Sequence, residues 1–188
     1  PSKANPRGFF EAQALAKLCR QAYKEPWLKE QNTFADRVAA LKAWAAMRRR
    51  QVGGRIFGGK HPTLCLMVPE MLEAWPDCRI IAVERAVEES EASLLSLGWG
   101  WPEEAVRTVL RRMIETRDAA LATIEDQGRV LRLPYRDLIE KPELTISMLK
   151  NFCGLNNIGG VKMKPTCSQN KAAMAFIEPK LNRHGSNQ

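Results

Sequence analysis

The sequence has no long apolar run, and this absence sets the first limit on the class of protein. A membrane-spanning helix needs about 20 consecutive apolar residues, and no stretch of the 188 residues approaches that length. The first residues, PSKANPRGFF, also lack the apolar segment of a secretory signal. From these two absences we expect a cytoplasmic protein without a membrane span.

Cysteine is scarce, and its spacing excludes two common kinds of site. The five cysteines stand at positions 19, 65, 78, 153 and 167, and no two of them form a C-x-x-C pair. The spacing therefore supports neither a zinc ribbon nor a thioredoxin-type redox centre, and no metal is implied. Their odd number and apolar neighbours predict reduced, part-buried thiols.

Internal repeats and low-complexity segments are absent as well. Apolar residues make up 45% of the chain and charged residues 27%, which is ordinary for a soluble globular protein. We expect a single domain over residues 1–188, with an irregular tail from 155 and one short helix near 169–178.

The formal net charge of +8 predicts attraction to anions without choosing among them. Nucleic acid, an acidic surface and a phosphorylated small molecule all stay open on charge alone. The basic residues are spread along the chain except for RRR at 48–50, which ends a helical pattern. Cations suit the negative end of a helix dipole, so a solvated helix end is favoured over a nucleic-acid patch.

What the sequence does contain is an alternation of strand and helix patterns. Strands are predicted at RIF (55–57), Ile80–Val83 and GRVLRLPY (128–135), and the stronger helices at 33–50, 87–97 and 103–126. A short helix opens at Pro69 and closes before Trp75-Pro76, and a last one ends at Gly154. Strands that alternate with helices longer than ten residues predict an α/β fold with a central parallel sheet flanked by helices.

Two helices have a clear apolar face. In 33–50, Thr33 is expected to cap the helix, and the inward residues are Phe34, Val38, Leu41 and Trp44. In 103–126 the inward residues are expected to be Val106, Leu110, Met113, Ala120 and Ile124.

The stretch RIIAVERAVEESEASLLS (79–96) holds the first candidate site. A strand predicted to be buried ends in Arg85, and Ser93 follows eight residues later on the next helix. Ligands bind at the carboxyl ends of parallel strands, and a guanidinium and a hydroxyl converging on one anion make a phosphate site. On these residues alone, an Arg85 paired with Glu88 or Glu89 and a solvated Ser93 is the competing interpretation.

Two further segments contain side chains that could bind a ligand or take part in catalysis. In GGKHP (58–62), Lys60 supplies a charge suited to a transferring anionic group. His61 titrates near neutral pH and can accept a proton from an alcohol. Tyr135 follows the strand 128–135 and presents a ring face on which a base can stack. Taken singly, Lys60 and His61 are better interpreted as surface residues and Tyr135 as a core-edge tyrosine.

In order and spacing these residues resemble the sulfotransferases that use 3′-phosphoadenosine-5′-phosphosulfate (PAPS). In that family an Arg at a strand end and a Ser eight residues later hold the 3′-phosphate, as Arg85 and Ser93 are spaced here. Upstream, a Lys-x-His-x-Pro segment supplies a Lys for the transferring sulfuryl group and a His as catalytic base. The segment KHP lies at the same distance, but Lys60 and His61 are adjacent instead of separated.

The resemblance extends over roughly residues 5 to 155. LPYRDLIEKPELTISMLKNFCGL is similar to the family's Tyr-Glu-Asp-Leu segment, which places Tyr135 beside the adenine ring, with Arg136 where Glu is usual. NPRGFFE (5–11) is similar to a segment of bacterial members and makes Glu11 a second candidate base.

One departure concerns the family's loop of Pro-Arg-Ser-Gly-Thr type, which binds the 5′-phosphosulfate through backbone N–H groups. No segment of the 188 residues reproduces this phosphate-binding loop, and we expect the loop to precede residue 1. GGRIFGGK is not a Walker-type loop, since His61 follows the lysine, and this argues against a kinase. The family's C-terminal Arg-Lys-Gly has only a faint counterpart in Arg183-His184-Gly185.

The resemblance implies a P-loop NTPase-like sulfotransferase architecture and transfer of a sulfuryl group from PAPS to a hydroxyl or amine. The product nucleotide would be 3′-phosphoadenosine-5′-phosphate (PAP), the acceptor is unknown, nucleic acid is not an expected partner, and the oligomeric state stays open. The implied site residues are Arg85, Ser93, Tyr135, Lys60, His61 and Glu11. The alternative is a non-catalytic nucleotide-, anion- or nucleic-acid-binding protein on a degraded version of the fold.

Overall fold

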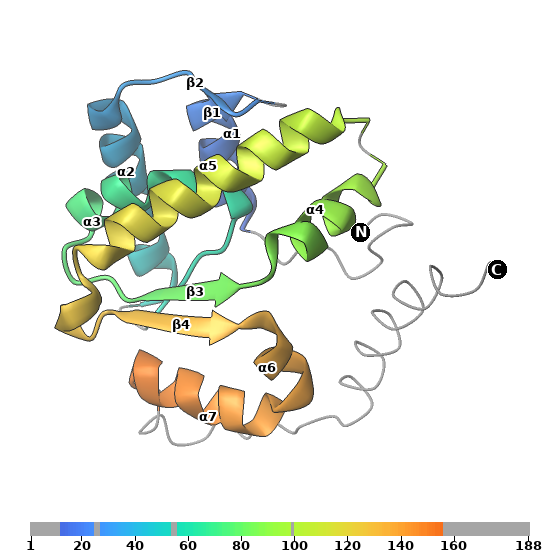
Figure 1. The fold of residues 1–188 in the computed structure, drawn as a ribbon. Coiled ribbons are helices and arrows are strands. Elements are labelled where there is room, and N and C mark those ends of the chain that lie inside the picture. Colours follow the sequence, from blue (N-terminus) through green and yellow to red (C-terminus); the bar gives the residue numbers. More distant parts are fainter. Residues whose placement is uncertain (1–11, 25–26, 54–55, 99, 156–188) are drawn as a thin grey trace. The chain divides into compact units, whose positions relative to one another are not determined.

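The computed structural model describes residues 12–24, 27–53, 56–98 and 100–155 (Figure 1). The described residues up to Arg132 form one compact unit and those from Leu133 form a second. Each unit is described by itself, and the expected single domain stays a prediction. The helix predicted near 169–178 lies outside the described residues.

The elements follow one another in an order dominated by helices. They are α1 (Gln13–Ala22), β1 (Tyr23–Lys24), β2 (Lys29–Glu30), α2 (Phe34–Gln51), η1 (Pro62–Met67), α3 (Val68–Ala74), β3 (Ile80–Glu84), α4 (Val87–Leu95), α5 (Glu103–Ala122), η2 (Glu125–Gln127), β4 (Val130–Pro134), α6 (Tyr135–Glu140) and α7 (Pro142–Cys153). The predicted helices that fall within the described residues are present, with α4 two residues and α5 four residues shorter than expected.

The ends of two helices confirm the signals read from the sequence. The Thr33 hydroxyl accepts a hydrogen bond from the Asp36 backbone N–H, and the Asp36 carboxylate accepts one from the Thr33 N–H. This reciprocal capping box satisfies two backbone donors at the start of α2. At the end of α7, Gly154 has a φ of 69°, the left-handed conformation in which glycine is favoured.

The sheet is smaller than predicted. Strands β3 and β4 form where expected and lie side by side in the same direction (Figure 1). The predicted strand at 55–57 is wrong for its described part, because Ile56 and Phe57 have no strand conformation. The Phe57 ring instead packs edge-on against Trp44 at a centroid distance of 5.8 Å, so a side-chain contact fixes this segment. In the described part of the chain the parallel sheet therefore has two strands.

The prediction that β3 is a buried strand holds for one of its faces and is wrong for the other. Ala82 is buried against Val68, Leu121 and Ile124, whereas Ile81 and Val83 are 39% and 45% exposed. Side chains alternate along a strand, so the two exposed residues share the face opposite Ala82.

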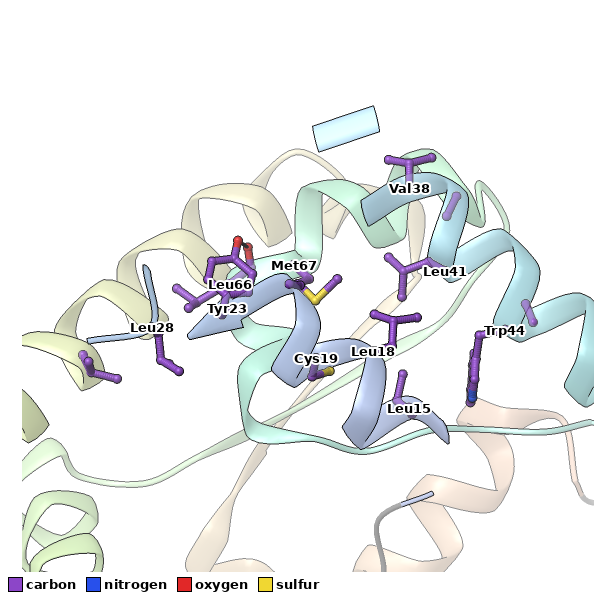
Figure 2. Close-up of a cluster of buried hydrophobic side chains, with 14 residues drawn as sticks. Leu15, Leu18, Cys19, Tyr23, Leu28, Val38, Leu41, Trp44, Leu66 and Met67 are labelled. Atoms are coloured by element: carbon purple, nitrogen blue, oxygen red, sulfur yellow. Dashed lines mark hydrogen bonds between the residues drawn. The ribbon is translucent and has the colours of Figure 1, made fainter. Parts of the chain in front are cut away.

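The main core lies between α1, α2, η1 and α5 (Figure 2). Val38, Leu41 and Trp44 are buried in it as predicted, but Phe34 is 46% exposed because it is the first residue of α2 and lies beyond the packed surface. On α5, Val106 and Leu110 are buried, as is Ile124 just after it, while Met113 and Ala120 are partly buried.

The four described cysteines are free thiols, which confirms the prediction for them. Cys19 is buried, and Cys65, Cys78 and Cys153 are partly buried. Burial raises the pKa of the Cys65 and Cys78 thiols, and it therefore favours their neutral form. No helix within the described ranges is long and apolar enough to cross a membrane.

Candidate functional site

Arg85 lies immediately after β3 and two residues before α4. Its Nε donates a hydrogen bond to Oε2 of Glu89 at 3.1 Å, a pairing between residues four apart. The ion pair considered from the sequence as the competing interpretation is therefore present. The Arg85 side chain is nevertheless 27% exposed and that of Glu89 35% exposed, so the pair stays open to solvent.

Ser93 is exposed on the same helix, one turn beyond Glu89. Residues four apart in an α-helix share a face, and a rise of about 1.5 Å per residue separates them by about 6 Å along the axis. Because Arg85 contacts Glu89, its guanidinium lies beside the face of α4 that also carries Ser93. A cationic fork and a hydroxyl on one exposed face are donors that fit a phosphate group.

The segment with Lys60 and His61 has no regular structure before η1. Lys60 is exposed, and His61 caps η1 by accepting a hydrogen bond at Nδ1 from the Thr63 N–H, at 3.2 Å. This bond uses the lone pair with which Nδ1 would accept a proton, and in the neutral ring the remaining proton is then on Nε2. The observed cap therefore gives His61 a structural role, and its role as a base stays a prediction.

The remaining predicted site residues belong to the second unit or lie outside the described residues. Tyr135 is the half-buried first residue of α6 and directly follows β4, as the sequence indicated, and it belongs to the second unit. Glu11 and Arg183-His184-Gly185 lie outside the described residues.

Comparison with protein-family models decides the family. The model described as the Sulfotransferase family matches residues 4–158, a range that contains Glu11, Lys60, His61, Arg85, Ser93 and Tyr135. The chain belongs to the sulfotransferase family. No curated protein and no solved structure matches it significantly. The family implies sulfuryl transfer and an α/β, P-loop-like fold, of which the described residues show the helices and a two-stranded parallel sheet.

Within the described residues, helix α4 is held by ion pairs more than by burial. None of its residues is buried, but Glu91 accepts a hydrogen bond from Nη2 of Arg107 on α5 at 2.8 Å. The same Arg107 nitrogen contacts Glu103 at 2.6 Å. The hydrogen bond with Glu91 is the main cause that raises the pKa of Arg107. The charged contacts thus fix the helix that carries Ser93.

The carboxyl end of β3 is held by a charge cluster that the sequence analysis missed. Arg132 of β4 donates to Glu84 at 2.7 Å, to Asp118 at 3.2 Å and to Glu125 at 2.8 Å. These bonds raise the pKa of the Arg132 guanidinium, the bond with Glu125 first. Glu84 immediately precedes Arg85, so the cluster fixes the backbone at the candidate site. An arginine interrupting the apolar strand VLRLP was the available signal.

An apolar pocket of about 250 Å³ adjoins the carboxyl end of α4. It is lined by Leu94, Leu95, Gly98, Gly100, Trp101 and Val106. Trp99, which precedes Gly100 in the sequence, lies outside the described residues.

The close packing of Gly59 yields a prediction about the neighbouring segment. A Cβ atom at this position would lie 2.6 Å from Leu15 Cδ2 and 2.8 Å from Trp44 Cη2. We expect Gly59→Ala to lower the free energy of unfolding by about 1–3 kcal/mol, because both core side chains must move. Gly58→Ala is the matched control, since a Cβ there meets nothing within 4 Å. Urea denaturation of both variants measures the effect, and equal midpoints would contradict the packing argument.

Proposed function

We propose that this protein transfers a sulfuryl group from PAPS to a hydroxyl or amine acceptor. The observation that carries the proposal is the ion pair of Arg85 with Glu89, which lies one helical turn before Ser93 on α4, directly after a parallel strand. Family membership supports sulfuryl transfer in general, and the donors of Arg85 and Ser93 support a nucleotide with a 3′-phosphate as its source.

Each proposed site residue has one task. Arg85 and Ser93 bind the 3′-phosphate, and the exposed Lys60 neutralises charge on the transferring group. PAPS supplies the activated sulfuryl group when it is bound. A protein base accepts the proton of the acceptor, and since the Nδ1 lone pair of His61 is engaged by Thr63, we favour Glu11 over His61.

Two further parts of the proposal concern the adenine ring and the acceptor. Tyr135 is proposed to stack on the adenine ring, as the family resemblance implies. The apolar pocket beside Trp101 is proposed to receive the apolar portion of the acceptor, because it adjoins the helix that carries Ser93. Neither residue is needed for the phosphate contact, so each can be tested independently of it.

Binding of PAP tests the phosphate site. We expect Arg85→Ala to weaken PAP binding by about 10- to 100-fold, because it removes charge-assisted hydrogen bonds worth about 1.5–3 kcal/mol. The matched control is Arg111→Ala, which removes an equal charge from an exposed position on α5. Isothermal titration calorimetry of the wild type and both variants gives the affinities, and thermal shift provides a second readout.

The outcomes separate the two classes of function. Loss of PAP affinity in Arg85→Ala alone, with transfer of label from PAPS to members of an acceptor panel, supports the enzyme. The same binding result without transfer to any acceptor supports the non-catalytic alternative. Equal PAP affinities of the wild type and Arg85→Ala would contradict the proposed site.

A further inference from the structure

We propose that Glu89 is a positioning residue that orients Arg85 for the 3′-phosphate, an inference that rests on the proposed function. The direct observation is the hydrogen bond of 3.1 Å from Nε of Arg85 to Oε2 of Glu89. Glu89 touches neither the nucleotide nor the reacting atoms in this proposal. It acts through the guanidinium that it holds.

The position of Glu89 on α4 explains why it can hold the arginine. It is the third residue of the helix, where the positive end of the helix dipole stabilises a carboxylate. The arginine precedes it by four residues, so the pair forms over the first turn. This contact holds the guanidinium beside the helix face that carries Ser93, one turn beyond Glu89. Without this contact, a long flexible side chain would lose more conformational entropy on binding a phosphate.

The chemistry of the guanidinium permits both contacts at once. It carries five N–H donors in a fixed planar arrangement, so a bond through Nε is compatible with a bidentate contact from the same group to a phosphate. The opposite interpretation is that the Glu89 carboxylate repels the phosphate and weakens binding. The neighbouring acids argue against a strongly repulsive site, because Glu84 is paired with Arg132 and Glu91 with Arg107.

Whether replacement of Glu89 weakens or strengthens PAP binding distinguishes positioning of Arg85 from repulsion of the phosphate. We expect Glu89→Ala to weaken PAP binding roughly three- to tenfold, because the guanidinium must be ordered at the moment of binding. Glu89→Gln should retain most of the affinity, since its amide oxygen can still accept the hydrogen bond from Nε. Glu88→Ala is the matched control, because it removes the same charge from an exposed position one residue away and should leave PAP affinity within about twofold.

A second ligand distinguishes a positioning role of Glu89 from a general loss of structure in the Glu89→Ala variant. Adenosine 5′-phosphate lacks the 3′-phosphate, so its affinity should be the same for the wild type and Glu89→Ala. All affinities are measured by calorimetry on the full chain at one ionic strength. An equal loss for both ligands would show a merely structural role and overturn the inference.

The remaining outcomes keep the two proposals distinguishable. If the wild type binds PAP, Arg85→Ala loses it and Glu89→Ala binds PAP equally or more tightly, the positioning role is overturned while the proposed function stands. If neither the wild type nor any Glu89 variant binds PAP, the proposed function fails and this inference fails with it.

Discussion

Replacing Glu70 by alanine is expected to lower the free energy of unfolding by about 3–5 kcal/mol, the largest effect that the structure predicts. Glu70 of α3 is 2% exposed and Arg37 of α2 is 5% exposed. Their Oε1 and Nε atoms lie 2.6 Å apart. Removal of the carboxylate leaves a guanidinium in the core without its buried counter-charge, and the cost of desolvating that charge is then uncompensated.

The other contacts of Arg37 cannot replace this one. Nη1 donates to the Asn32 carbonyl and lies 3.2 Å from the Glu30 carboxylate, which is half exposed. Desolvation acts to lower the pKa of Arg37, but the hydrogen bond with Glu70 is the largest of the opposing causes, and the net pKa is raised. The carboxylate of Glu70 is thus the main group that offsets the free energy of desolvating the buried, charged guanidinium.

A matched ion pair on the surface provides the control. Arg107 and Glu103 are also 2.6 Å apart, but the Glu103 side chain is 63% exposed. Glu103→Ala should therefore cost less than about 1 kcal/mol. The double variant Arg37→Met/Glu70→Met should recover most of the stability lost in Glu70→Ala, because it removes both buried charges together. Chemical denaturation measures all of these, and similar midpoints for Glu70→Ala and Glu103→Ala would contradict the argument.

Local sequence signals predicted the helices well and the burial of single residues less well. The capping box at Thr33 and the glycine at 154 act within one turn, and both were correct. The Arg37–Glu70 pair was missed because it joins residues 33 positions apart, and periodicity does not say which acid meets a buried arginine. The exposure of Ile81 and Val83 was missed for the same reason, since it depends on what covers the outer face of β3.

In the candidate site, too, contacts between residues close in the sequence were predicted better than contacts between distant segments. The relation between Arg85, Glu89 and Ser93 is set by helical spacing, so both the phosphate site and its competing ion pair were predicted from the sequence. The cap made by His61 was not predicted, although a histidine before Pro-Thr is a local signal for it. The Arg132 cluster unites two strands, a helix and a turn, and no local pattern specifies that combination.

Alkaline pH should destabilise this protein through Tyr23. The ring is 3% exposed, and burial first, then the charge of Glu70, raises the pKa of its hydroxyl to about 12 from 10.0. Below pH 10 the hydroxyl is protonated in the folded and unfolded states, so its contribution to stability is fully present. Between about pH 10 and 12 the unfolded state releases the proton more readily than the folded state, which removes on the order of 2–3 kcal/mol of stability.

Tyr23→Phe isolates this contribution, because it removes the titrating group while lysines and other residues still titrate in both proteins. The free energy of unfolding of the wild type should fall roughly 2–3 kcal/mol more than that of Tyr23→Phe between pH 9.5 and 12.5. Parallel profiles would show that the hydroxyl titrates normally. Glu70 raises the pKa of Tyr23 by its charge, so in Glu70→Ala the absorbance titration assigned to Tyr23 should shift to lower pH. The same carboxylate that stabilises the Arg37 guanidinium would then be shown to keep Tyr23 neutral.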